Sequence, residues 1–175
     1  MSEATTLNTE AHNSAGPTTA GAEAAGHELV LERVMDVSRD KLYRCWTETE
    51  LLKQWFCPKP WIVSYAAFDV RPGGSSLVVM KSPDGEEFAN PGVFLDVVEN
   101  ERLVMTDAYT SAWVPSQKPF MTAIVTFEDI GGGRTRYVAR AVHWSAEDKA
   151  THEAMGFHEG WGKAADQLED VAKAL

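Results

Sequence analysis

The chain has 175 residues, of which 44% are hydrophobic, and a formal net charge of −10 at pH 7. This length and composition suit a single domain with one substantial core. The acidic balance and the scattered Lys and Arg residues argue against nucleic acid as a partner, and no apolar run approaches the roughly 20 residues needed for membrane insertion. Cys45 and Cys57 show no metal-ligand spacing, so we expect free thiols and a cytoplasmic protein.

The first 27 residues differ in composition from the rest of the chain. They are rich in Ala, Thr, Gly, Ser and Glu and contain no aromatic residue. Such a segment buries too little apolar surface to offset the entropy lost on ordering. A targeting peptide would need an Arg-rich amphipathic pattern or an apolar centre, and the segment shows neither. We therefore expect a disordered tail over 1–27 and one domain over 28–175.

From residue 28 onward, the spacing of hydrophobic residues indicates strands and helices. Residues 28–37 predict a first strand, and 38–56 predict two short helices, with Ser38 and either Thr47 or Thr49 as N-caps. Six further strands are predicted at 61–70, 75–82, 88–98, 101–111, 120–129 and 134–144. The short turns between them favour an antiparallel meander. In the turn RPGG, at least one of Gly73 and Gly74 should take a positive φ, because the chain reverses there.

A long helix is predicted over about 147–174, with Ser145 as its N-cap and Asp148 as the capping-box partner. Its buried stripe should contain Ala154, Trp161, Ala165, Leu168, Ala172 and Leu175. The helix also contains Gly156, Gly160 and Gly162, each of which costs about 1 kcal/mol relative to alanine in a helix interior. Some structural or functional role should therefore offset the destabilising effect of these glycines.

The element order and several motifs resemble a known superfamily. The motifs are FDVRPGG before a strand, GVFLDVVENERLVMT, VTFEDIGGGRTR and GFHEGWGKAADQLEDVAKAL. Over residues 28–175 they are similar to the START-related SRPBCC superfamily, which includes polyketide cyclases and Bet v allergens. The most similar branch is the one named after the activator of heat-shock protein 90 ATPase. The resemblance implies an α+β helix-grip fold, in which a curved antiparallel sheet of about seven strands surrounds a long C-terminal helix, with two short helices after the first strand.

The same resemblance implies a cavity between sheet and helix, which we expect to bind a small hydrophobic or aromatic molecule. On the strand at 134–144, Arg136 and Arg140 share one face, so the other face, with Tyr137 and His143, should point inward. The same alternation on the strand at 75–82 should turn Ser76, Val78 and Met80 inward. Trp46 is expected to pack in the core. The candidate ligand-binding residues are Trp55, Trp61, Val78, Met80, Phe94, Trp113, Tyr137, His143, Met155, Gly160 and Trp161.

Two explanations for the glycines stay open. Gly156 and Gly160 are four residues apart and would share one helix face. Their missing side chains would either give a ligand access to the cavity or allow close backbone packing against the sheet without any ligand.

Catalysis has two candidate residues, His143 as a general base and Tyr137 beside it. No nucleophile motif accompanies them, and a hydrogen-bonded core histidine is the favoured alternative for His143. His152 and His158 are six apart and do not share a helical face, so no metal site is expected. We also expect no cofactor. A polyketide cyclase-like or hydrolase-like enzyme is the alternative function, and a heat-shock protein 90 co-chaperone-type module is the third. A homodimer stays open.

Overall fold

The computed structural model describes residues 26–175, and the tail predicted over 1–27 lies outside the described residues except for its last two. Seven antiparallel strands form the main sheet in the order β1-β9-β8-β5-β4-β3-β2. Their bounds are β1 Glu28–Met35, β2 Ile62–Phe68, β3 Ser75–Lys81, β4 Glu87–Val98, β5 Arg102–Thr106, β8 Met121–Asp129 and β9 Thr135–His143. The predicted helix-grip fold is confirmed.

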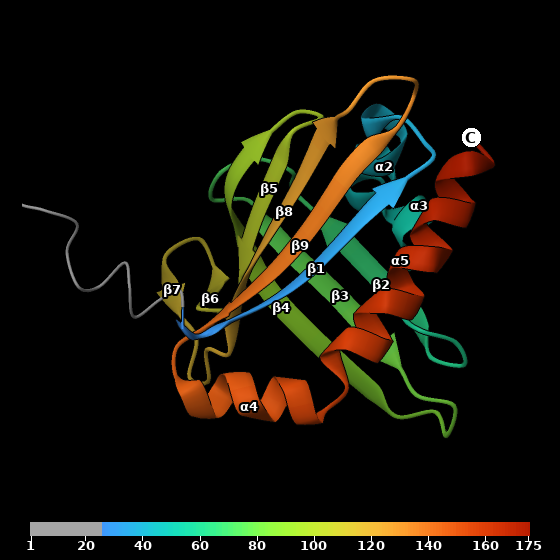
Figure 1. The fold of residues 1–175 in the computed structure, drawn as a ribbon. Helices are drawn as coiled ribbons and strands as arrows, with labels where there is room; N and C mark the ends of the chain where they lie inside the picture. The colour runs from blue at the N-terminus through green and yellow to red at the C-terminus, as the bar shows by residue number, and fades with distance from the viewer. Residues whose placement is uncertain (1–25) are drawn as a thin grey trace, which may run out of the picture.

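Four helices flank this sheet in the described part of the chain. Helices α2 (Arg39–Thr47) and α3 (Thr49–Leu52) connect β1 to β2, and α4 (Ala146–Ala154) and α5 (Phe157–Lys173) follow β9. Figure 1 shows α5 lying along the open side of the curved sheet and α4 lying across one end of it. Helix α5 packs against α2 and β1, and α4 packs against α5 and β9. The helices therefore close a volume that the sheet begins to enclose.

The prediction of one continuous C-terminal helix is wrong. Helix α4 ends at Ala154, and Gly156 has φ +90°, a left-handed conformation that glycine adopts without steric cost. Ser145 caps α4 as predicted, since its hydroxyl oxygen accepts a hydrogen bond from the Asp148 backbone N–H at 3.0 Å. Gly156 therefore forms the turn between α4 and α5, and it does not share a helix face with Gly160.

The break also changes the predicted stripe. Ala165, Leu168 and Ala172 are buried on α5 as expected, and Trp161 packs against the core while remaining partly exposed. Ala154 is exposed on α4, and Leu175 is exposed after the end of α5. The heptad spacing fails at Ala154 because the helix axis changes direction at Gly156, so only the residues that follow the break keep one common face.

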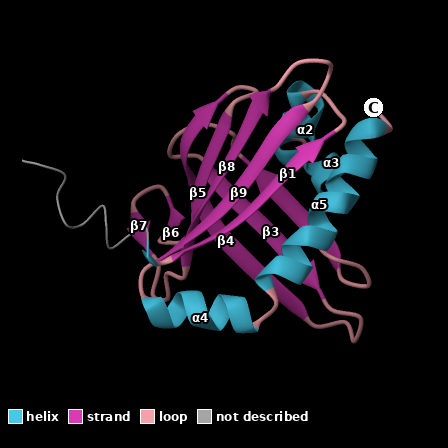
Figure 2. Cartoon of the chain, viewed as in Figure 1, coloured by secondary structure: helices cyan, strands magenta, loops and turns pink. Residues whose placement is uncertain are grey.

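The strand predicted at 101–111 is also interrupted. Strand β5 ends at Thr106, and residues Tyr109–Ser111 (β6) pair with Val114–Pro115 (β7) in a separate hairpin. The Asp107 carboxylate accepts hydrogen bonds from the backbone N–H groups of Phe120 and Met121 at 2.9–3.1 Å, which joins the two ends of this excursion. In Figure 2 the hairpin projects from the side of the sheet opposite to α5.

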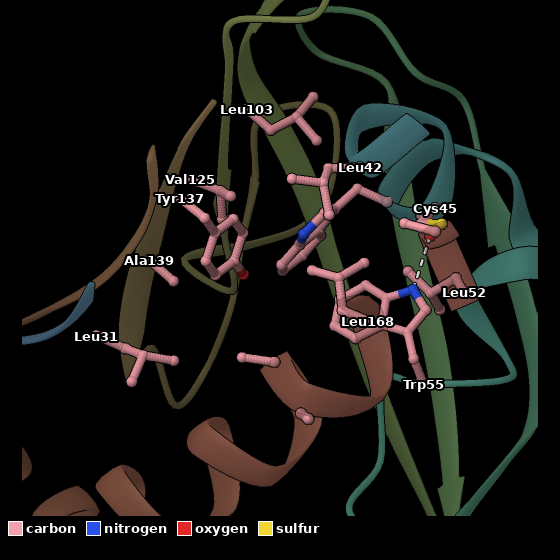
Figure 3. Packing of buried hydrophobic residues seen from close by; sticks show 14 of the residues in the cluster. Leu31, Leu42, Cys45, Leu52, Trp55, Leu103, Val125, Tyr137, Ala139 and Leu168 are labelled. Atoms are coloured by element: carbon pink, nitrogen blue, oxygen red, sulfur yellow. Dashed lines mark hydrogen bonds between the residues drawn. The ribbon is translucent and has the colours of Figure 1, made fainter. Parts of the chain in front are cut away.

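Strand β9 presents the two faces that its alternation predicts. On the outer face, Arg136 forms ion pairs with Glu32 and Glu128, and Arg140 pairs with Glu28 across the β1–β9 ladder. The inner face is buried and consists of Thr135, Tyr137, Ala139, Ala141 and His143. Figure 3 shows Val125 and Leu103 on the sheet side of the core, and Leu42, Leu52 and Leu168 on the helix side. The short alanine side chains of β9 leave space between the two layers.

Candidate functional site

A cavity of about 450 Å³ lies between the inner face of the sheet and α5. This volume lies within the range of small-molecule sites, which are typically concave and mostly apolar. Its wall takes residues from all seven strands of the main sheet and from α2, α4, α5 and the loop after α3. Met155, which is 74% exposed, lies at the rim beside the turn between α4 and α5. The site is therefore open to solvent at one end.

The helical part of the wall is largely aromatic. Trp46 of α2 stacks edge-on against Trp55 at a ring-centroid distance of 4.9 Å, and Phe56 packs against both rings. From α5, Phe157 and Trp161 pack at 4.6 Å and face the same cavity. Trp46 is buried in the core as predicted, and it also forms part of the wall.

Gln167 of α5 holds the loop after α3 against the cavity. Its Nε2 donates to the backbone oxygens of Trp55 and Cys57, both at 2.8 Å, and its Oε1 accepts from the Lys59 N–H at 3.2 Å. Because one side chain satisfies three backbone groups, the loop is fixed in position and Pro58 is held at the wall. The helical spacing gave no signal for this role, because a half-buried glutamine in an amphipathic helix has no special pattern.

Gly160 lies on the wall opposite Pro58. A Cβ built on Gly160 would lie 3.9 Å from the Pro58 Cγ, which is ordinary van der Waals contact. Close packing against the sheet therefore does not require glycine at this position. Gly162 is different, because a Cβ there would lie 3.3 Å from the Arg33 Nη2 of β1. Of the three glycines, Gly156 makes the turn, Gly162 packs closely, and Gly160 borders the cavity.

The sheet side of the wall includes the β3 residues that were expected to point inward. Ser76, Val78 and Met80 all line the cavity. Tyr137 of β9 joins them, and Figure 3 shows its ring reaching from the sheet side into the space between sheet and helices. Seven of the predicted ligand-binding residues thus lie on the wall, namely Trp55, Val78, Met80, Tyr137, Met155, Gly160 and Trp161.

Four predicted residues do not line the cavity. Phe94 is fully buried behind Phe68, against which it packs edge-on at 5.6 Å. Trp61 is exposed and packs on Phe88 outside the site, and Trp113 is 64% exposed in the β6–β7 turn. The fourth, His143, reaches the cavity only through another residue.

That residue is His152 of α4, which sequence reasoning missed. The His143 Nδ1 lies 2.9 Å from the backbone oxygen of His27, and the His143 Nε2 lies 2.9 Å from the His152 Nδ1. A carbonyl oxygen only accepts, so a neutral His143 carries its proton on Nδ1 and accepts from the His152 Nδ1–H. In neutral His152 the Nε2 is therefore an acceptor, and it makes no hydrogen bond with any residue of 26–175.

The surroundings of His152 favour its neutral form. Its ring packs against Phe120, Phe157 and Trp161 at centroid distances of 5.1 to 5.7 Å. Burial and, secondarily, the neighbouring His143 lower the pKa of His152 from 6.5 to about 4. An imidazole of this kind is an uncharged hydrogen-bond acceptor at neutral pH.

Charged groups contribute little to the wall. Of the described residues that line the cavity, Asp107 is the only charged one, and its carboxylate accepts hydrogen bonds from two backbone N–H groups. No group of three or more His, Cys, Asp or Glu side chains within 26–175 is placed to hold a metal ion. Among the described helices, none has the length and apolar character to cross a membrane.

Comparison with known proteins places the chain in a family. Residues 36–173 match the family described as Activator of Hsp90 ATPase homolog 1-like protein. A solved structure from Nitrosomonas europaea is 42% identical with a TM-score of 0.82, and the match covers 86% of this chain and 96% of that one. No curated protein matches the chain.

More distant solved structures share the fold. A Mycobacterium smegmatis protein is 23% identical with a TM-score of 0.71, covering 85% of this chain and 91% of its own. A Rhodobacter sphaeroides protein is 17% identical with a TM-score of 0.74, covering 86% of this chain and 95% of its own. The chain therefore belongs to the Activator of Hsp90 ATPase homolog 1-like family of the SRPBCC superfamily.

Proposed function

We propose that the protein binds a small hydrophobic or aromatic molecule in the cavity between the sheet and α5. The observation that carries this proposal is the wall itself, which surrounds about 450 Å³ with aromatic and aliphatic side chains and few polar groups. A ligand that covers the apolar surface of such a cavity removes this surface from water, which lowers the free energy and favours binding.

Methionines make this wall adaptable. Four of the five methionines in residues 26–175 line the cavity, namely Met80, Met105, Met121 and Met155. Their unbranched side chains change shape at little cost, so they can fit ligands of different outline. On the other side lie the rigid indoles of Trp46 and Trp55, inclined at 63° to each other, and the flat face of either ring is a surface against which an aromatic ring can stack.

Titration with a neutral naphthalene dye whose emission rises in apolar surroundings tests this function. Trp46, Trp55 and Trp161 line the cavity, so a bound dye should also quench their fluorescence. Ala164→Leu adds a side chain on the cavity face of α5 and should weaken the dye at least about tenfold, which is about 1.4 kcal/mol. Ala150→Leu, on the exposed surface of α4, is the matched control and should bind normally. Equal binding by both variants would place the dye elsewhere.

Native mass spectrometry of the purified protein provides an independent measurement. A retained molecule would add a discrete mass that disappears on denaturation. Ala164→Leu should lose that added mass, whereas Ala150→Leu should keep it. Retention of the same mass by both variants would contradict binding in this cavity.

A further inference from the structure

One hydrogen-bond donor on the cavity wall has no partner among residues 26–175. The Trp46 side chain is only 6% exposed, and its Nε1–H makes no hydrogen bond with the described residues. Buried donors are nearly always paired, so an unpaired one at a cavity calls for an explanation. The other large indole beside it is satisfied, because the Trp55 Nε1–H donates to the Cys45 backbone oxygen at 2.9 Å.

The Tyr137 hydroxyl lies next to this unpaired indole. Burial raises the pKa of Tyr137, and the Trp46 N–H beside the phenol oxygen partly opposes that rise, although the two groups stay outside hydrogen-bond geometry. No residue of 26–175 accepts a hydrogen bond from the Tyr137 hydroxyl. An indole N–H only donates, whereas a phenol both donates and accepts. The Tyr137 hydroxyl and the Trp46 indole N–H are therefore available as hydrogen-bond donors to a ligand in the cavity.

The charged residues around the cavity indicate whether the ligand group that this pair binds is neutral or charged. No Lys or Arg in the part of the chain that the structure describes lines the cavity, and the carboxylate of Asp107 already accepts two backbone hydrogen bonds. A ligand carboxylate or phosphate would thus be buried without a counter-charge, which is costly. His152 cannot supply the missing donor, because the hydrogen bond to His143 leaves only a lone pair on its Nε2.

We propose that Tyr137, supported by the Trp46 indole N–H, donates a hydrogen bond to a neutral oxygen acceptor, such as a ketone or quinone carbonyl, on an otherwise apolar aromatic ligand. This inference rests on the proposed cavity binding and adds the chemical class of the ligand. The ligand's rings lie against the aromatic and methionine wall, and its carbonyl points toward the Tyr137–Trp46 donor pair. The preference is for neutral aromatic carbonyl compounds over fatty acids or phosphate esters.

Three naphthalene probes with one common ring system separate this inference from cavity binding in general. The first is 6-propionyl-2-(dimethylamino)naphthalene, a neutral ketone. The second has a propyl group in place of the propionyl group, and the third has a carboxylate. Wild-type protein should bind the ketone and the propyl probe and should bind the carboxylate most weakly. Tightest binding of the carboxylate would overturn the inference, and failure of all three probes to bind would overturn the proposed function with it.

Variants then locate the donor. Tyr137→Phe removes the hydroxyl and should weaken the ketone about tenfold while changing the propyl probe less than about twofold. Trp46→Phe should show the same selectivity, whereas Trp55→Phe should affect the two probes alike. Ser76→Ala, which removes another hydroxyl from the wall, should leave the ketone's affinity unchanged. Equal losses for ketone and propyl probes in Tyr137→Phe would overturn the inference and leave cavity binding intact.

The emission wavelength of the bound ketone in wild-type protein shows whether its carbonyl accepts a hydrogen bond, and this measurement does not depend on any variant folding. A hydrogen bond to the carbonyl shifts the emission of this dye to longer wavelength than in an apolar solvent without donors. We expect the shifted emission in wild type and its loss in Tyr137→Phe. Emission typical of a donor-free apolar solvent in the wild-type complex would overturn the inference.

Discussion

The Nε2 atom of His143 lies 2.9 Å from the Nδ1 atom of His152, so a pair of buried histidines joins the end of β9 to α4. The His143 Nδ1 continues the chain to the backbone oxygen of His27, just before β1. Three segments that are far apart in the sequence are thereby connected at the end of the sheet where α4 packs. The pair fixes the orientation of His152, which is the one histidine of residues 26–175 that lines the cavity.

This pair should make stability depend on pH. Burial and then His143 lower the pKa of His152 from 6.5 to about 4 in the folded protein. As pH falls below 6.5, the unfolded chain takes up a proton that the folded chain does not bind until about pH 4. The free energy of unfolding should therefore decrease across this window by roughly 3 kcal/mol and then level off for this group.

Urea unfolding at pH 7, 6 and 5 would measure the effect. His152→Gln should flatten the dependence, and His158→Gln, at an exposed position of α5, should retain it. A slope that is unchanged in His152→Gln would assign the pH dependence to other groups.

The fold could be predicted in detail because its signals are local. Alternation in β9 correctly gave the inward faces of Tyr137 and His143, and the same reasoning gave Val78 and Met80 on β3. The presence of an aromatic side chain was a poorer predictor of a position on the cavity wall. Trp113 has no periodic neighbours that reveal its direction, and it lies exposed in a turn.

The missed role of His152 has a specific cause. A helix read as continuous through Gly156 places His152 far from β9, whereas the observed break turns α4 across the end of the sheet. A usable signal was present, because glycine two residues after a helix end is a common C-terminal cap. Hydrogen bonds between distant segments, such as those of Gln167 to the loop after α3, carry no comparable local signal.

Gly160 should be replaceable without loss of stability. Because a Cβ would meet only Pro58 at 3.9 Å, Gly160→Ala should raise the free energy of unfolding by up to about 1 kcal/mol through its better helix propensity. Gly160→Leu should also fold, but its longer side chain should enter the cavity and weaken the neutral dye by about tenfold or more. A stable Gly160→Leu variant with normal dye affinity would show that this position does not control access.

The RPGG turn should be much less tolerant at its second glycine. A Cβ on Gly74 would lie 1.8 Å from the Asp69 backbone oxygen, so Gly74→Ala must displace the main chain and should cost more than about 3 kcal/mol. Gly73 has the predicted positive φ, +77°, and a Cβ there would lie 3.6 Å from the Trp113 ring, which is ordinary van der Waals contact, so Gly73→Ala should cost only about 1–2 kcal/mol. Thermal denaturation of both variants tests the order. Similar losses would mean that the turn relaxes at no great cost.

The two cysteines should be unreactive in the folded protein. Both are free and buried, and burial raises the pKa of Cys45 and of Cys57 to about 11. Since the thiolate is the reactive form, a disulfide reagent at pH 8 should modify neither thiol quickly, and both should react once the chain is unfolded in denaturant. Rapid modification of the native protein would show that one of these segments opens readily.

The two neighbouring tryptophans should differ in their contribution to stability. Cys45 lies near the end of α2, where carbonyl groups lack partners within the helix, and the Trp55 Nε1–H satisfies its oxygen at 2.9 Å. Trp55→Phe leaves that buried oxygen unpaired, whereas Trp46→Phe removes a donor that has no partner among the described residues. Both changes shrink an indole to a phenyl ring in the same aromatic cluster, so their packing losses should be similar. Trp55→Phe should therefore be more destabilising by about 1–3 kcal/mol, as measured by urea unfolding in the absence of ligand. If Trp46→Phe proved equally or more destabilising, its indole N–H would have to be paired in solution, and its role as a donor held free for a ligand would fail as well.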